Sequence, residues 1–167
     1  MTVWVDNDPP EDKAVGAYLG KLLTWLGYRA TVRDIPEPQY KAVIVNAHAK
    51  VQVGQAATWG ADYPTPSDFF LPDLTCQSFY ANPADTNNIT GFCDPQADKL
   101  ASRAQAAQLT DPAAARRLWA QVDRIVTDKA PWAPIFNAST TVFVSARVRN
   151  YQASPFYGPL LDQIWIK

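Results

Sequence analysis

Hydrophobic and polar positions change their period twice within the first 35 residues. Residues 2–5 and 29–35 alternate with a period of two, which predicts two short strands. Between them, residues 11–26 have apolar side chains at helical spacing, and Gly27 is a suitable residue to end a helix. The apolar set is Val15, Leu19, Leu22, Leu23 and Leu26. Strand, helix and strand with short connections predict a βαβ unit.

The middle of the chain has weaker patterns. Residues 39–49 combine β-branched residues that favour a strand with alanines that favour a helix, so both alternatives stay open. Residues 51–59 predict a buried strand, and residues 67–73 predict a short helix. Residues 75–90 are rich in Asn and Thr, which predicts an irregular surface loop.

Two later helices have clear starting signals. Asp94-Pro95 and Asp111-Pro112 each place an aspartate at the N-cap and a proline at the first helical position. We expect helices to about residues 108 and 129, both acting as scaffold, with Trp119 in the core. Beyond them the pattern predicts an extended segment at 130–134, short strands at 134–137, 140–145, 147–151 and 163–166, and a loop at 152–161.

Composition excludes several classes of protein. The chain has 167 residues, of which 47% are hydrophobic, and this is typical of one globular domain rather than of a disordered segment. The net charge is −1 and no run of five or more basic residues occurs, so we expect no nucleic-acid partner. No apolar stretch reaches the roughly 18–20 residues of a membrane span, and the N-terminus has no signal-peptide pattern.

The sequence contains no recognisable catalytic motif and no cofactor-binding motif. His48 is the only histidine, no nucleophile lies near it in sequence, and no glycine-rich phosphate-binding loop occurs. Asp6 and Asp8 are better explained as capping residues than as metal ligands, and two cysteines cannot form a cysteine-rich zinc site. We therefore expect a binding protein rather than an enzyme, without a cofactor or metal.

The strongest candidate site is a short turn that contains Trp59, Asp62 and Tyr63, followed by Pro64 and Pro66. The prolines restrict the backbone, so the turn is expected to be rigid. A carboxylate between aromatic side chains suits an ammonium group. The structural alternative is a strand end with Trp59 in the core and Asp62 as a cap.

Several motifs, in order, resemble those of the extracellular solute-binding proteins of ABC importers, in the class that binds dipeptides and oligopeptides. Residues 59–64 resemble its Trp-x-x-Asp-Tyr-Pro signature, and residues 88–94 resemble its asparagine-containing segment before a helix. Asp98 falls where the family has an aspartate near the start of a helix, and Arg116, Leu118 and Trp119 resemble a second helix motif. Residues 130–135 resemble its Ala-Pro-x-x-Pro segment.

This resemblance implies the fold. The expected class is α/β, with a mixed sheet flanked by helices that forms the second lobe of a two-lobed periplasmic-binding-protein-like fold. Residues 1–167 would be one such lobe from a longer chain, and about 133–167 would cross back to pack on the first lobe. The resemblance also favours a helix at 39–49 and a disulfide between Cys76 and Cys93, with two buried free thiols as the alternative.

The resemblance also implies the function, which is capture of a solute for ABC-type import by closure of two lobes. Peptides are the expected ligand, with Asp62 pairing with the α-ammonium and with Trp59 and Tyr63 as walls. Ala56 stands where some relatives have an arginine, which weakens the expectation for peptides, and sugars or other solutes remain alternatives. A sensing module fused to a regulatory or kinase domain is the second hypothesis, and an enzyme is a third.

The same resemblance predicts partners and location. Permease subunits of an ABC transporter would be partners, and the full-length protein would be an extracytoplasmic, lipid-anchored monomer. Its only contact with the membrane would be an anchor outside these residues. One lobe supplies only half of a cleft, so we expect this chain alone to bind its ligand weakly or not at all.

Overall fold

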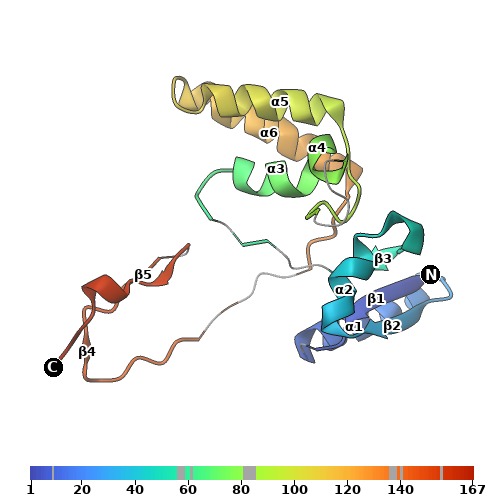
Figure 1. The fold of residues 1–167 in the computed structure, drawn as a ribbon, viewed down its shortest axis with the longest axis horizontal. Coiled ribbons are helices and arrows are strands. Elements are labelled where there is room, and N and C mark those ends of the chain that lie inside the picture. The colour runs from blue at the N-terminus through green and yellow to red at the C-terminus, as the bar shows by residue number, and fades with distance from the viewer. Residues whose placement is uncertain are drawn as a thin grey trace.

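The computed structural model describes residues 1–8, 10–55, 59–60, 62–80, 86–135, 139, 141–154 and 156–167, without the side chains of Ala47 and Tyr80. Figure 1 shows three parts along the chain: a small α/β unit at the N-terminus, a group of helices, and a C-terminal segment that extends away from both. Among the described residues, none of the helices combines the length and apolar character needed to cross a lipid bilayer.

The α/β unit is built on a three-stranded parallel sheet. Its elements in order are β1 (Thr2–Asp6), α1 (Pro10–Trp25), β2 (Thr31–Ile35), α2 (Glu37–Ile44), a 3₁₀ turn (Ala47–Ala49) and β3 (Val53–Gly54). The strand order is β2-β1-β3, and β1 pairs in parallel with both neighbours, with Thr2 opposite Thr31 and Val3 opposite Val53. The predicted strand-helix-strand unit is therefore confirmed.

Helix α1 lies very close to the sheet because glycines face it. Gly16 and Gly20 are its buried residues, and a Cβ atom at Gly16 would lie 2.3 Å from Cγ2 of Val5. The leucines expected to form the buried face are only half-buried, and Leu26 is exposed. Gly27 follows the helix with a φ of +90°, which confirms its role as the stop.

Helix α2 resolves the ambiguity at residues 39–49 in favour of a helix, and its side chains complete the core of this unit. Ile35, Tyr40, Ile44 and Val45 form a buried cluster. The Tyr40 hydroxyl donates to the carbonyls of Trp4 and Gln55 and so connects α2 to the middle of β1 and to the residue after β3. The strand predicted at 51–59 was too long: β3 has two residues, it is not fully buried, and residues 56–58, including Ala56, lie outside the described residues.

The helical unit contains α3 (Ser67–Leu74), α4 (Cys76–Tyr80), α5 (Pro95–Ala107) and α6 (Pro112–Lys129). Helices α5 and α6 lie side by side, with α3 beneath them in the view of Figure 1. Their shared core includes Phe70, Leu74, Ala97, Ala101, Ala104, Trp119 and Val122. The rings of Phe70 and Trp119 meet edge to face, with centroids 6.1 Å apart. Both helix starts, and the core position of Trp119, were predicted correctly.

The surface loop predicted at residues 75–90 was wrong in two respects. It contains α4, and Asn88 within it is fully buried. The Asn88 side-chain amide donates to the carbonyls of Thr75 (2.9 Å) and Phe92 (2.8 Å), and its oxygen accepts from the Phe92 amide (3.1 Å). A polar side chain can be buried because all of these bonds are made. Residues 81–85 lie outside the described part of the chain.

The C-terminal segment contains two small antiparallel pairs. Strand β4 (Val148–Arg149) pairs with β7 (Trp165–Ile166), and β5 (Ala153–Ser154) pairs with β6 (Gly158–Pro159), with a 3₁₀ turn at Leu161–Gln163. The loop predicted at 152–161 thus contains a hairpin, and residues 141–145, predicted as a strand, form none. Residues 136–138 and 140 lie outside the described residues.

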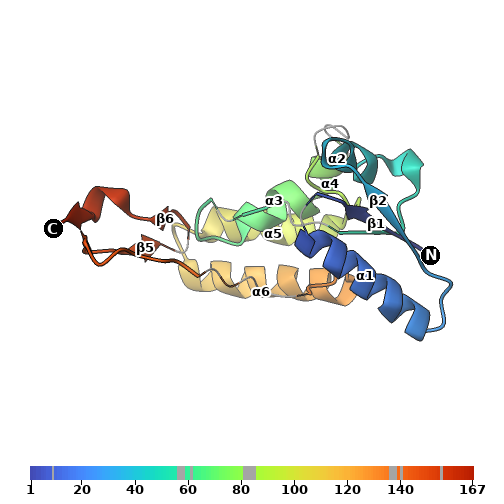
Figure 2. The same ribbon diagram turned by 90° about the horizontal axis from the view of Figure 1, so that it is seen from below.

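The predicted α/β class is confirmed, whereas a single mixed sheet is not what the described residues form. Three separate sheets occur among them: one parallel and two antiparallel. The parallel sheet is covered by helices of its own unit, whereas no helix of the described residues covers the C-terminal pairs (Figure 2). Few side chains of the C-terminal segment are buried, and Phe143 before it is 93% exposed.

Candidate ligand-binding site

The predicted site residues lie on the turn that leads into α3. Asp62 is exposed, Tyr63 is 44% exposed and Trp59 is half-buried. The Trp59 indole N–H is buried and has no hydrogen-bond partner within the described residues. Trp59 is therefore more enclosed than the other two, while Asp62 and Tyr63 are presented to solvent.

A buried carboxylate holds this turn. Oδ2 of Asp68, in the first turn of α3, accepts from the backbone amides of Asp62 (2.6 Å) and Tyr63 (3.3 Å). The Asp68 amide in turn donates to the carbonyl of Thr65, which closes the loop from the other side. Asp68 is only 2% exposed. The sequence analysis missed this residue, although an acidic residue in the first helical turn is a recognisable signal.

An open pocket of about 350 Å³ lies beside the turn. Its lining residues are Tyr63, Pro64, Thr65, Pro66, Phe69 and Phe156. Phe156 comes from the loop between β5 and β6, so the C-terminal segment meets the turn here, and Figure 2 shows the two close together. Of the three predicted residues, the structure places only Tyr63 in this lining. The sequence analysis gave Phe69 no role in binding. It did not identify Phe156, because no local pattern links this distant residue to the turn.

A second buried carboxyl group lies further along α3. Asp73 is 1% exposed, and neither of its oxygens has a hydrogen-bond partner within the described residues. Burial, and secondarily the negative charge of Asp68, raise the pKa of Asp73 to about 6. This carboxyl group therefore gains and loses its proton around pH 6 while it is enclosed in the helical unit.

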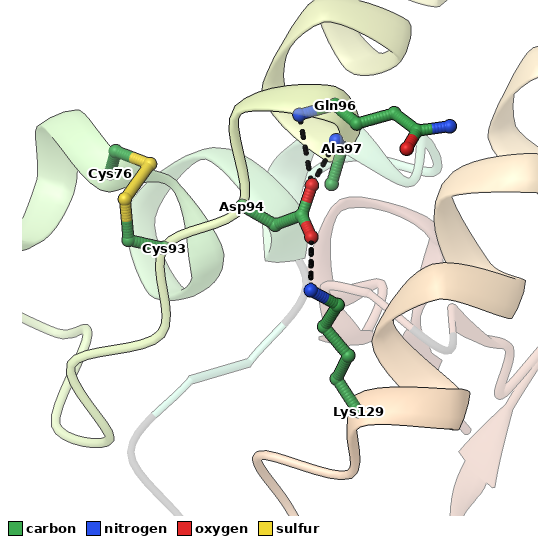
Figure 3. A network of polar contacts seen from close by, with 6 residues as sticks. All are labelled: Cys76, Cys93, Asp94, Gln96, Ala97 and Lys129. Carbon is green, nitrogen blue, oxygen red and sulfur yellow. Dashed lines mark hydrogen bonds and ion pairs between the residues drawn. A yellow bond between two sulfur atoms is a disulfide. The ribbon is translucent and has the colours of Figure 1, made fainter.

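The disulfide expected from the resemblance is present, and Figure 3 shows it beside the start of α5. It joins Cys76, at the start of α4, to Cys93, immediately before the α5 cap. The Asp94 side chain accepts from the amides of Gln96 (2.8 Å) and Ala97 (2.9 Å) and pairs with Lys129 of α6 at 2.7 Å. The bond from Lys129 and the amide bonds lower the pKa of Asp94. These contacts connect the start of α4, the start of α5 and the end of α6.

A second open pocket, of about 580 Å³, lies between α1 and β2. It is lined by Ala17, Gly20, Lys21, Thr24, Trp25, Ala30 and Val32. It contains none of the predicted site residues. Within the part of the chain that the structure describes, no group of three or more His, Cys, Asp or Glu side chains could hold a metal ion.

Comparison with known proteins gives a relative by sequence. The chain is 26% identical over 131 residues, or 78% of its length, to the dipeptide-binding protein of Pseudomonas aeruginosa, of which it spans 23%. No family model matches the chain.

Solved structures agree in fold. A dipeptide-binding protein from Pseudoalteromonas in complex with Met-Leu superposes on the whole chain with a TM-score of 0.75 at 19% identity. The Escherichia coli murein tripeptide-binding protein MppA gives 0.72 at 18% identity and covers 99% of this chain. The chain spans 32% and 30% of these proteins.

In sequence and in fold, the chain is similar to a segment of the family 5 peptide-binding proteins. This confirms the resemblance found in the motifs. A further similar structure is an ABC transporter-associated periplasmic binding protein of Helicobacter pylori in complex with the peptide STSA. It has a TM-score of 0.70 at 16% identity, and this chain spans 31% of it. The matched proteins are named for binding peptides and not for catalysis.

Proposed function

We propose that this chain supplies part of the ligand site of an ABC importer's solute receptor, and that the ligand is a peptide. The observation that carries the proposal is the pinned turn, which presents the Asp62 carboxylate and the Tyr63 ring beside an aromatic pocket. The peptide-binding relatives support the choice of ligand.

The chemistry of the turn suits the amino end of a peptide. An exposed carboxylate on a fixed backbone can accept charge-assisted hydrogen bonds from an α-ammonium group. Tyr63, Phe69 and Phe156 can contact an apolar side chain of the same ligand, because they line one pocket. In this proposal a second lobe closes over the ligand and excludes water, and residues from about 133 to the C-terminus pack on that lobe.

The proposal extends to location and partners. The receptor would work outside the cytoplasm as a lipid-anchored monomer and would deliver its peptide to permease subunits. The Cys76–Cys93 disulfide supports an oxidising compartment. A sensing module could use the same site, and no contact in the described residues favours it over the receptor.

Binding calorimetry on the natural gene product that carries this chain tests the proposal. The ligands are the dipeptide Met-Leu, a panel of other dipeptides, and N-acetyl-Met-Leu, which lacks the ammonium charge. We expect a dipeptide to bind, its acetylated form to bind worse, and Asp62→Ala to weaken binding by about 10- to 100-fold. Asp123→Ala, at an exposed position on α6, is the control. Failure of every dipeptide, or full affinity in Asp62→Ala, would overturn the proposal.

A further inference from the structure

Asp68 is a buried carboxylate that holds the backbone of the candidate site. One oxygen of Asp68 accepts both the Asp62 amide at 2.6 Å and the Tyr63 amide at 3.3 Å. Both donors belong to the two residues that the site presents to solvent. The two amides and the N-terminal end of α3 are the kind of donors that suit a carboxylate, and among the described residues no cationic side chain pairs with Asp68.

The remaining contacts of the turn fix its path but leave the amides of residues 62 and 63 to Asp68. The Thr65 amide donates to the Tyr63 carbonyl (2.8 Å), and the hydroxyls of Thr65 and Ser67 lie 2.5 Å apart. The Asp68 amide donates to Thr65 (3.1 Å). Among the described contacts, the Asp68 side chain is therefore the only group of α3 that bonds directly to the backbone of Asp62 and Tyr63.

From this geometry we infer that Asp68 is a positioning residue, which orients the Asp62 carboxylate and the Tyr63 ring for the ammonium end of the ligand. The inference rests on the proposed function. Without the two amide bonds the turn can rotate its peptide planes, and the Asp62 carboxylate then samples directions that do not face the bound ammonium. We therefore expect removal of the Asp68 carboxylate to weaken binding of the ligand's ammonium group more than binding of its apolar side chain.

Three variants in the natural gene product separate positioning from general stability. Asp68→Ala removes both amide bonds, whereas Asp68→Asn keeps one carbonyl oxygen that can accept them. Leu74→Ala, which opens the core beneath the same helix, is the control for destabilised α3 because Leu74 is buried and makes no contact with the turn's amides.

The first measurement needs no ligand. Amide hydrogen exchange is followed at Asp62 and Tyr63 by NMR. We expect exchange to accelerate about tenfold or more in Asp68→Ala, less in Asp68→Asn, and not in Leu74→Ala. Unchanged exchange in Asp68→Ala would overturn the inference, whether or not any peptide binds, so it can fail separately from the proposed function.

The second measurement is the ratio of the affinities for Met-Leu and for N-acetyl-Met-Leu. We expect Asp68→Ala to weaken Met-Leu binding about tenfold and to reduce this ratio, and Asp68→Asn to restore part of both. Leu74→Ala should keep the ratio of the unmodified protein. A ratio unchanged in Asp68→Ala, or one reduced equally by Leu74→Ala, would also overturn the inference.

Discussion

Among single residues, Asp73 has the clearest dependence on pH. Its pKa is raised from 3.8 to about 6 by burial and by the charge of Asp68. Between about pH 4 and pH 6 the folded chain therefore binds more protons at this group than the unfolded chain does, so the free energy of unfolding falls as pH rises. The full shift corresponds to roughly 2–3 kcal/mol, lost on passing from pH 4 to neutral pH.

We expect Asp73→Asn, which cannot ionise, to match the parent chain near pH 4 and to exceed it by about 1–3 kcal/mol at pH 7. The measurement is urea unfolding at several pH values, and the quantity of interest is the difference between the two chains. The matched control is the same substitution at an exposed aspartate of α6, Asp123→Asn. A difference between the parent and Asp73→Asn that stays constant from pH 4 to pH 7 would contradict the prediction.

The sequence revealed some site residues and not others for a physical reason. Asp62 and Tyr63 belong to a contiguous motif, so they could be named, although their role in binding stays a prediction. Asp68 and Asn88 act through bonds to backbone that lies four to thirteen residues away. No local sequence pattern shows that other segments of the chain fold against these two residues. Asn88 was therefore predicted to lie in a surface loop, although it is fully buried.

At the scale of elements, helices were predicted better than strands because their signals are local. Aspartate caps followed by proline marked α5 and α6 almost to the residue. The buried face of α1 was misjudged because periodicity counts large apolar side chains, whereas close approach to Val5 requires the absence of a side chain at Gly16. A strand of two residues is too short to show an alternating pattern, and these strands are defined only by their pairing with another segment.

The two aspartate caps give a comparison within one chain. Asp94 is buried, accepts two amides and pairs with Lys129, whereas Asp111 is exposed and accepts one amide, that of Ala114. We expect Asp94→Ala to lower the free energy of unfolding by about 2 kcal/mol and Asp111→Ala by about 1 kcal/mol. Because the pKa of Asp94 is lowered, its contribution is present above about pH 4 and is lost as pH falls further.

Urea unfolding of both variants at pH 7 and pH 3 checks the comparison of the caps. Lys129→Met is the matched control for the ion pair, and since the Lys129 side chain is 57% exposed its loss should lower stability by less than about 1 kcal/mol. Equal effects of Asp94→Ala and Asp111→Ala would contradict the view that the buried cap joins α5 to α6.

For the whole molecule, the distribution of exposed apolar side chains is the main observation. Trp25 on α1 is 81% exposed, and the C-terminal segment exposes Tyr157, Leu161, Trp165 and Ile166. The chain spans about 30% of the structures that it matches. Both facts agree with the proposal that the natural protein places further residues against these surfaces.

The last prediction follows from the openness of the site. The aromatic pocket beside Tyr63 is formed on one side only, by the turn, α3 and the β5–β6 loop, and it is open to solvent. A peptide bound there would stay hydrated, which weakens both its ion pair with Asp62 and its apolar contacts. We therefore expect residues 1–167 alone to bind Met-Leu at least about 100-fold more weakly than the natural gene product. Calorimetry on both proteins measures this ratio, with circular dichroism to establish that residues 1–167 are folded. Equal affinity would mean that this part of the chain holds the complete site, and that closure of a second lobe is unnecessary for capture.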